Sequence, residues 1–239
     1  MPELICVGCG PGDPELLTVK AVNAIKDAEV IMCPTSKEGK PSIALSVISS
    51  LIDESQKQIV NLVFPMTKDK EKLSITWENN AKILAEMVLS GKKVIYLTVG
   101  DPYLYSTWIY LNRELETKYP QIKVKVIPGI VSMFTFASKV GISLAEGAEK
   151  MAVIPSCYDL SQVKELAKNC DTMIFLKDGR YFDQVIDLLR EAGFSENSIF
   201  AIGQDLDTDQ EIVKKLTLGQ VTDEVFTTKY FSIMVVKRV

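Results

Sequence analysis

The stretch that best indicates the fold runs Val94-Ile-Tyr-Leu-Thr-Val-Gly-Asp-Pro-Tyr-Leu-Tyr-Ser-Thr107. Its first part, Val94–Val99, is an apolar run interrupted only by a threonine, which is typical of a strand buried on both faces of a parallel sheet. A glycine, an aspartate and a proline follow at once, so the strand ends in a tight loop. Because open α/β sheets bind small molecules beyond the carboxyl ends of their strands, we expect a ligand at residues 100–107.

Short runs of the same kind alternate with helical patterns along the first half of the chain. Predicted strands cover Leu4–Val7, Glu29–Cys33, Ile59–Val63 and Val94–Val99. Between them, apolar residues recur at helical spacing, at Leu17, Ala21, Ile25 and Ala28 and again at Ala81, Ile83, Leu84 and Met87. This alternation predicts βαβ units around a mostly parallel sheet.

A second domain is indicated where the polar stretch Glu114–Gln121 gives way to a new alternation at Lys123–Ile127. We therefore expect two α/β domains, residues 1–118 and 119–239. The second half contains predicted strands at Met151–Ile154, Thr172–Leu176, Ser198–Ile202, Glu211–Leu216 and Tyr230–Val236, with helices near Ser161–Lys168 and Arg180–Ala192. The last two strands leave no room for a normal crossover helix, which predicts a mixed sheet in this domain.

The composition is that of an ordinary globular protein. The chain has 239 residues, of which 47 % are hydrophobic and 24 % charged, and its net charge is −4. The acidic balance and the lack of a long basic cluster argue against nucleic acid as a partner. No apolar run reaches the ~20 residues of a membrane span, and the N-terminus lacks a signal-peptide pattern. We therefore expect a cytoplasmic protein with no membrane partner.

Two residue types limit the chemistry. The chain has no histidine, which excludes histidine triads and histidine general bases and leaves proton transfer to Asp, Glu, Lys, Tyr or Cys. Its cysteines are scattered, and Cys6-Val-Gly-Cys9 has no second pair to complete a zinc site. We expect no metal site and interpret Cys6 as a core residue.

A glycine-rich loop, Gly8-Cys-Gly-Pro-Gly-Asp-Pro14, follows the first predicted strand. Glycines allow positive φ and a close approach to a ligand, while Asp13 followed by Pro14 is typical of a helix start. The loop lacks the third glycine of a dinucleotide fingerprint and the Gly-Lys-Ser/Thr of a phosphate loop. A tight turn with incidental ligand contact is one interpretation, and the cofactor site of a dinucleotide-dependent oxidoreductase is the other.

The loop after Val99 also has two interpretations. Asp101 followed by Pro102 is the pattern of a helix N-cap and first helical residue, which would make both residues structural. Tyr103 and Tyr105 favour a site instead, because two aromatic side chains in one turn suit a ligand cleft or a partner subunit. The same aromatic segment, continuing to Leu111, predicts a homodimer, since it places apolar groups on more faces than one buried stripe absorbs.

Three segments, taken together and in this order, resemble the tetrapyrrole methylase family of S-adenosylmethionine-dependent methyltransferases. They are Val7-Gly-Cys-Gly-Pro-Gly-Asp-Pro-Glu-Leu-Leu-Thr18, Gly100-Asp-Pro102 and Ile127-Pro-Gly-Ile-Val-Ser132, and the resemblance covers essentially the whole chain. Within the family, three segments resemble the enzymes of cobalamin biosynthesis that methylate C20 of precorrin-2 or its cobalt complex. They are Gly100-Asp-Pro-Tyr-Leu-Tyr-Ser-Thr107, Leu144-Ala-Glu-Gly147 and Gly203-Gln-Asp205.

The resemblance implies two α/β domains with the active-site cleft between them, S-adenosylmethionine as methyl donor, a tetrapyrrole as small-molecule substrate, and a homodimer. Carried over position by position, it implies cofactor contacts from Pro11, Val99, Gly100, Asp101, Leu104, Val131, Ser132, Lys177 and Asp205. Lys177 stands where uroporphyrinogen methylases have methionine, which points to a role specific to the subfamily.

Methyl transfer to a carbon of the macrocycle needs mainly positioning, followed by the loss of a proton. Since no histidine is present, the expected catalytic residues are Asp101, as base or as stabiliser of the sulfonium, and then Tyr105 and Lys177.

Cations are expected to bind the carboxylates of the substrate, and the candidates are Lys37, Lys40, Lys177 and Arg180. The sequence leaves open whether the macrocycle carries cobalt. Alternatives to C20 methylation are transfer to another precorrin, to a translation factor or to ribosomal RNA, and a binding subunit without activity.

Overall fold

The chain divides into two units, Met1–Val131 and Ser132–Val239. The computed structural model describes residues 2–155, 160–177, 181–208, 210–222, 225 and 232–239. The division lies further along the chain than the expected boundary after residue 118, because the segment Lys123–Ile127 is a strand of the first sheet. Residues 119–131 therefore pack with the first unit.

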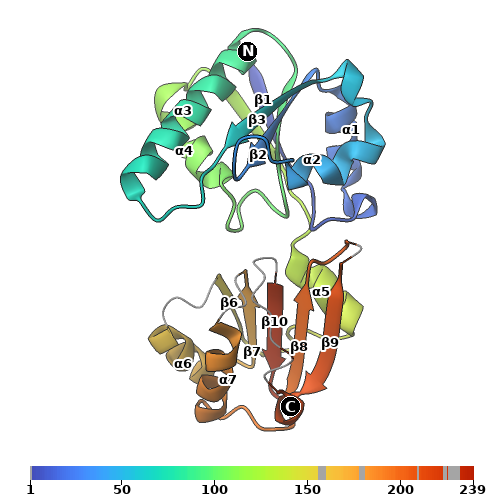
Figure 1. Cartoon of the computed structure of the whole chain (residues 1–239), viewed down its shortest axis with the longest axis vertical. Helices are drawn as coiled ribbons and strands as arrows, with labels where there is room; N and C mark the ends of the chain where they lie inside the picture. The colour runs from blue at the N-terminus through green and yellow to red at the C-terminus, as the bar shows by residue number, and fades with distance from the viewer. Residues whose placement is uncertain (1, 156–159, 178–180, 209, 223–224, 226–231) are drawn as a thin grey trace. The chain divides into compact units, whose positions relative to one another are not determined.

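A five-stranded parallel sheet forms the centre of the first unit. Its strands are β1 (Glu3–Gly8), β2 (Val30–Thr35), β3 (Gln58–Val63), β4 (Val94–Thr98) and β5 (Lys123–Ile127), in the order β3-β2-β4-β1-β5 (Figure 1). Every neighbouring pair is parallel, so the C-terminal ends of all five strands lie on the same side of the sheet, which we call its carboxyl edge. This edge carries the glycine-rich loop after β1 and the loop of residues 99–107 after β4.

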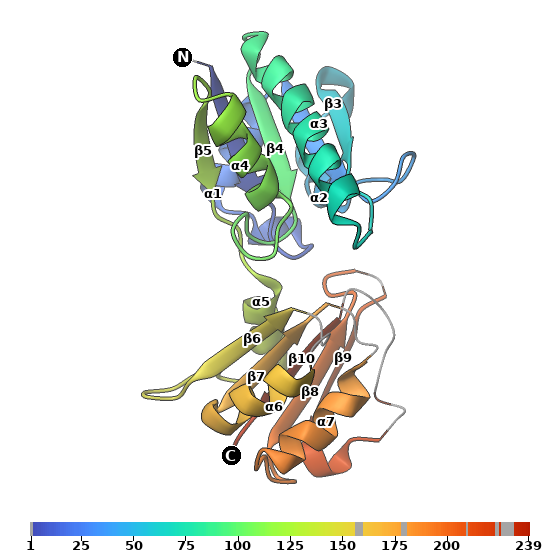
Figure 2. The same cartoon turned by 90° about the vertical axis from the view of Figure 1, so that its left-hand side faces the viewer.

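Helices cover both faces of this sheet. The helices α1 (Val19–Asp27) and α2 (Ile43–Ile48) lie on one face, and α3 (Lys70–Leu89) and α4 (Trp108–Lys118) lie on the other (Figures 1 and 2). On β4, Ile95 packs into the core under α1 and α2, whereas Tyr96 packs into the core under α3 and α4. Burial on both faces explains why this strand is an unbroken apolar run.

The second unit is built on a mixed sheet. Its strands are β6 (Met151–Pro155), β7 (Thr172–Leu176), β8 (Ile199–Gln204), β9 (Ile212–Thr217) and β10 (Ser232–Lys237), in the order β6-β7-β10-β8-β9. Among the described strands of this unit, only β6 and β7 pair in parallel. The predicted fold class, two α/β units with one parallel and one mixed sheet, is confirmed. The mixed character arises because β10 inserts between β7 and β8, not because β9 pairs with β10.

The described helices of the second unit are α5 (Ser132–Val140), α6 (Leu160–Asn169) and α7 (Phe182–Glu191). The helices α6 and α7 share one core with the sheet, which contains Phe175 and Phe182. The helix α5 packs elsewhere, against β8, where Gly203 leaves room for a ring: a Cβ at Gly203 would lie 2.5 Å from Cε2 of Phe136. The glycine of the Gly203-Gln-Asp205 motif therefore serves packing.

Both Asp-Pro patterns mark turns, not the starts of the long helices. Asp13 caps a short 3₁₀ helix, Pro14–Leu16, and α1 begins only after Thr18, whose hydroxyl accepts the Ala21 N–H. No helix begins at Pro102, since the next helix, α4, begins at Trp108. Further 3₁₀ helices cover Ser49–Leu51, Glu54–Gln56 and Leu218–Gln220.

The aromatic segment that predicted a homodimer is packed only in part within the first unit. Trp108 and Leu111 are fully buried, and Tyr110 stacks on Trp77 of α3 with ring centroids 4.2 Å apart. Tyr103, Tyr105 and Tyr110 nevertheless remain 58 %, 39 % and 40 % exposed, so the homodimer stays a prediction. No helix among the described residues is both long and apolar enough to cross a membrane.

Candidate functional site

The loops after β1 and β4 are joined by backbone hydrogen bonds. The Gly100 N–H donates to the Gly10 carbonyl at 2.7 Å, and the Gly10 N–H donates to the Gly100 carbonyl at 3.3 Å. The Cys9 N–H also donates to the Thr98 carbonyl at 2.8 Å. The two Gly-Asp-Pro loops thus form one rigid surface at the carboxyl edge of the sheet.

Two glycines of this edge are required by contact between backbones. A Cβ at Gly129 would lie 2.1 Å from the Gly100 carbonyl oxygen, and a Cβ at Gly8 would lie 2.5 Å from the Gly129 nitrogen. No side chain fits at either position without a shift of the backbone. The Pro-Gly turn after β5 is therefore held directly against the joined loops.

Gly100 differs from these glycines. Its φ is +69°, which favours glycine, and no atom lies within 4 Å of the position that a Cβ would take. The space beside its backbone is open, so a ligand is able to approach the main chain there. This geometry fits the cofactor contact that the resemblance implied for Gly100.

The carboxylate of Asp101 binds backbone on two sides. Its Oδ1 accepts the Tyr103 N–H at 2.9 Å, and its Oδ2 accepts the Gly129 N–H at 3.1 Å. The first bond shapes the turn after Gly100, and the second ties this turn to the loop after β5. The geometry gives Asp101 a positioning role that neither sequence interpretation contained.

Ser106 fixes the other end of the same loop. Its hydroxyl lies 2.8 Å from the Thr98 hydroxyl and accepts the N–H of Trp108, the first residue of α4, at 3.1 Å. Between these anchors, Tyr103 and Tyr105 are 58 % and 39 % exposed. Burial raises the pKa of Tyr105, and its φ of 52° is unusual for a residue other than glycine.

Lys177 lies at the carboxyl end of β7 in the second unit. Its φ is 64°, its N–H donates to the Ser232 carbonyl at 2.9 Å, and its side chain is half-buried. Burial lowers the pKa of the Lys177 ammonium below its usual 10.5. Arg180, the other cation expected nearby in sequence, lies outside the described residues.

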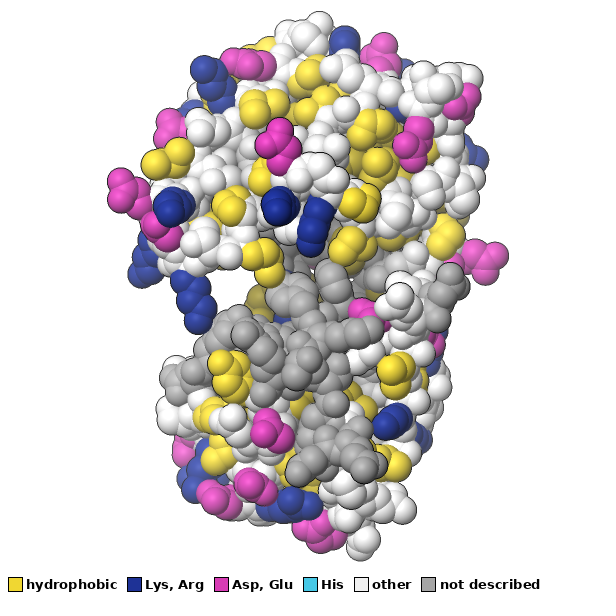
Figure 3. Space-filling model, in the orientation of Figure 1, with side chains coloured by type: hydrophobic (Ala, Val, Ile, Leu, Met, Phe, Trp, Pro, Cys, Tyr) yellow, Lys and Arg dark blue, Asp and Glu magenta, His cyan; other side chains and the backbone are white. Residues whose placement is uncertain are grey.

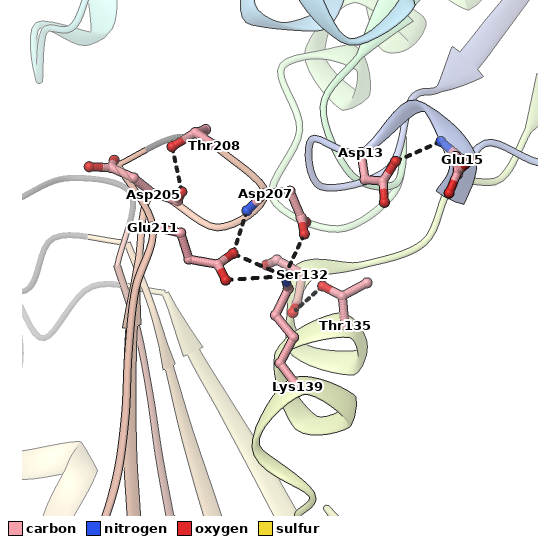
Figure 4. Close-up of polar contacts among 9 residues, drawn as sticks. All are labelled: Asp13, Glu15, Ser132, Thr135, Lys139, Asp205, Asp207, Thr208 and Glu211. Atoms are coloured by element: carbon pink, nitrogen blue, oxygen red, sulfur yellow. Dashed lines mark hydrogen bonds and ion pairs between the residues drawn. The ribbon is translucent and has the colours of Figure 1, made fainter.

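Asp205 lies in the loop between β8 and β9, which an ion cluster fastens to α5 (Figure 4). The Lys139 ammonium lies 2.9 Å from Oδ1 of Asp207 and 3.0 Å from Oε2 of Glu211. Sequence reasoning missed this cluster. A signal was present in the sequence, since residues 205–211 include three aspartates and a glutamate, and so many carboxylates in one short segment favour a cation nearby.

All nine predicted cofactor contacts are half-buried, and their contact with a cofactor stays a prediction. The joined loops of the first unit bring together Pro11, Val99, Gly100, Asp101 and Leu104, and Val131 ends the turn that these loops contact. The remaining contacts, Ser132, Lys177 and Asp205, belong to the second unit.

The second unit also has a surface feature that lies apart from these residues. An apolar groove of about 590 Å³ on the second unit contains none of them and is lined by Phe134, Ala137, Ser138, Gly141, Ile142, Leu144, Ala145 and Met151.

Burial raises the pKa of the Cys9 and Cys33 thiols to about 12, so neither is a reactive thiolate. In the described part of the chain, no group of three Cys, Asp or Glu side chains is placed to hold a metal ion.

The family model for Tetrapyrrole (Corrin/Porphyrin) Methylases matches residues 3–222, and the chain belongs to this family.

Particular members are similar over most of their length. A probable cobalt-precorrin-2 C(20)-methyltransferase of Methanocaldococcus jannaschii is 36 % identical over 203 residues, which are 81 % of this chain and 84 % of that protein. A precorrin-2 C(20)-methyltransferase of a Sinorhizobium species is 28 % identical over 206 residues, covering 83 % and 82 %. The structure of uroporphyrin-III C-methyl transferase from Thermus thermophilus with S-adenosylhomocysteine has the same fold, with a TM-score of 0.67, 17 % identity and coverage of 98 % and 97 %.

Proposed function

We propose that this protein transfers a methyl group from S-adenosylmethionine to C20 of precorrin-2 or of its cobalt complex. The observation that carries the proposal is the similarity to the archaeal C(20)-methyltransferase over most of both chains. The three sequence segments that resemble the C20 enzymes lie in ordered parts of the structure, at residues 100–107, 144–147 and 203–205.

The residues at the carboxyl edge of the first sheet fit the cofactor. S-adenosylmethionine supplies, when bound, a methyl group activated by a positively charged sulfur. Gly100 offers open space beside its backbone, and Leu104 and Val99 offer half-buried apolar surface. Asp101 holds this loop in place through its bonds to Tyr103 and Gly129. From the second unit we assign Ser132 and Asp205 to the cofactor, and Lys177 to both cofactor and substrate.

Transfer forms a carbon–carbon bond at C20 as the sulfur–methyl bond breaks, and the proton at C20 then leaves. Lys177 is the best candidate to accept this proton, because burial lowers the pKa of its ammonium and so favours the neutral amine. Tyr105 is less suitable, since its raised pKa keeps it protonated at neutral pH. Asp101 has both oxygens engaged by backbone N–H groups, which favours the positioning role over that of the base.

Lysines at the carboxyl edge of the first sheet are suited to the carboxylates of a tetrapyrrole. Lys37 and Lys40 are exposed in the loop after β2, and Lys70 is exposed at the start of α3 after β3. Figure 3 shows positively charged side chains (dark blue) over the lower part of this face of the first unit. We assign Lys37 and Lys40 to substrate binding, because long cations at a loop edge meet carboxylates without a large desolvation cost.

We further propose a homodimer and a cytoplasmic location. The apolar groove of the second unit supports the dimer, because Phe134 and Met151 at its rim are 49 % and 42 % exposed and a second copy would cover them. Light scattering at twice the chain mass of 26.6 kDa is the expected result, and a monomer with full activity contradicts the dimer.

Calorimetry separates the proposed methyltransferase from a dinucleotide-dependent enzyme. S-adenosylhomocysteine is expected to bind the purified protein, and NADH is expected not to bind. Mass spectrometry after incubation with S-adenosylmethionine and precorrin-2, with and without cobalt, is then expected to show the mass of one added methyl group. Binding of NADH alone, or no mass change with either macrocycle, would overturn the proposal.

A further inference from the structure

The loop between β8 and β9 is fastened to α5 by Lys139. The ammonium of Lys139 lies 2.9 Å from Oδ1 of Asp207 and 3.0 Å from Oε2 of Glu211, and Oε2 of Glu211 also accepts the Asp207 N–H at 2.7 Å. The Asp207 side chain is only 6 % exposed, so this ion pair is partly shielded from solvent. Such a pair constrains geometry more than a fully exposed one.

The loop needs this restraint because its backbone is strained. Asp205 and Asp207 have φ values of 46° and 62°, in the left-handed region that residues other than glycine rarely adopt. Strained conformations of this kind persist only where surrounding contacts hold them. The contacts that Lys139 makes with Asp207 and Glu211 are of this type, and they hold the loop two residues beyond Asp205.

The same lysine belongs to the face of α5 that begins at Ser132. Residues seven apart lie two helical turns apart on one face, and side chains on a helix lean towards its N-terminus. Figure 4 shows the Lys139 side chain running along α5 towards its N-terminal end, where Ser132 lies. At the other end of α5, the ammonium of Lys215 on β9 donates hydrogen bonds to the Val140 and Gly141 carbonyls.

We infer that Lys139 is a positioning residue for cofactor binding, which fixes the Asp205 loop against the helix that carries Ser132. The inference rests on the proposed function, because both Ser132 and Asp205 are cofactor contacts only there. Lys139 itself touches neither cofactor nor substrate. It lowers the entropy lost when the cofactor binds, since its ion pairs already hold Asp207 and Glu211 in place.

The test compares three variants by calorimetry with S-adenosylhomocysteine and by steady-state kinetics. Lys139→Met is expected to raise the Kd and the KM for S-adenosylmethionine about tenfold, equivalent to ~1.4 kcal/mol, with kcat at saturation within about threefold of the parent value. Lys139→Arg keeps a cation in the cluster and is expected to restore most of the affinity. Lys164→Met is the control, because it breaks the ion pair of Lys164 with Glu191 on α6 and α7 in the same unit.

A second measurement reads the loop itself. Amide hydrogen exchange at residues 205–208, 210 and 211 is expected to rise in Lys139→Met and to stay unchanged in Lys164→Met. If Lys139→Met does not fold, Glu211→Gln removes one partner of the cluster and is expected to give a smaller rise in Kd, about threefold. Faster exchange with an unchanged Kd overturns the inference, as does a fall in kcat with an unchanged KM. Failure of the parent protein to bind S-adenosylhomocysteine contradicts the proposed function instead.

Discussion

Asp101 and Gly129 are joined by a hydrogen bond, in which Oδ2 of the aspartate accepts the backbone N–H of the glycine at 3.1 Å. The bond connects the loop after β4 to the turn after β5, which follow strands on either side of β1. The absence of a side chain at Gly129 makes the contact possible, since a Cβ there would collide with the Gly100 carbonyl oxygen. One carboxylate therefore sets the relative positions of two loops to which we assign the cofactor.

Replacing Asp101 by Asn is expected to lower both stability and cofactor affinity. The amide keeps one acceptor oxygen but turns an NH₂ group towards a backbone N–H, so one donor is left unpaired, at a cost of about 1–3 kcal/mol in the free energy of unfolding. Urea denaturation measures this cost. Asp53→Asn is the matched control, because Asp53 accepts the Ser55 N–H in a similar exposed turn but joins no second loop. Unchanged stability with turnover reduced by a factor of about 100 would instead assign the carboxylate to the chemistry.

Gly100→Ala is expected to weaken binding of S-adenosylhomocysteine about tenfold, or ~1.4 kcal/mol, because the new methyl group occupies the open space beside the backbone. The positive φ adds a cost in stability of roughly 1–2 kcal/mol. Gly91→Ala has a similar positive φ and similar open space, so it controls for strain alone. Equal affinities of the two variants for S-adenosylhomocysteine would remove Gly100 from the cofactor site.

Arg238→Met is expected to destabilise the second unit by about 2 kcal/mol, since charged hydrogen bonds to helix ends are lost. The guanidinium of Arg238 lies 4.1 Å from the centre of the Phe194 ring and donates to the carbonyls of Ala167, Cys170, Ala192 and Gly193, at the C-terminal ends of α6 and α7. Thermal unfolding followed by circular dichroism measures the loss. Arg113→Met, at an exposed position of α4, is expected to change stability by no more than ~0.5 kcal/mol, and a similar change in both variants would contradict the capping role.

The lowered pKa of Lys177 leads to a prediction of how activity depends on pH. Burial lowers its pKa below 10.5, so kcat is expected to rise with pH along a limb whose apparent pKa lies below that value, and Lys177→Met is expected to lose this limb. Because the folded state then binds fewer protons than the unfolded state between the two pKa values, stability attributable to Lys177 increases with pH across that window. A limb that persists in Lys177→Met would move the base to another residue.

The sheets were predictable because burial on both faces leaves a direct trace in the sequence. Every residue of β4 is buried, and the unbroken apolar run follows from that. The end of the first unit was not predictable. Strand β5 lies at an edge and alternates in exposure, and an edge strand has the same pattern whether it closes one sheet or opens the next.

The site was predictable only in part, because its decisive contacts are distant in sequence. Asp101 followed by Pro102 is a local pattern shared by helix caps and turns, and the Gly129 N–H that decides between them comes from another strand. The Lys139 cluster likewise depends on α5 meeting a turn between two later strands. Local patterns identified the loops, whereas the contacts that hold them needed the fold.

The most direct test of the proposed activity is to locate the transferred carbon. The protein is incubated with S-adenosylmethionine carrying a ¹³C-labelled methyl group and with precorrin-2 or its cobalt complex, and the product is examined by NMR. We predict one labelled methyl group on C20 of at least one of the two macrocycles. The macrocycle that is methylated at the higher rate is then assigned as the substrate. A label at another ring position, or no label in either macrocycle while S-adenosylhomocysteine still binds, would contradict this prediction.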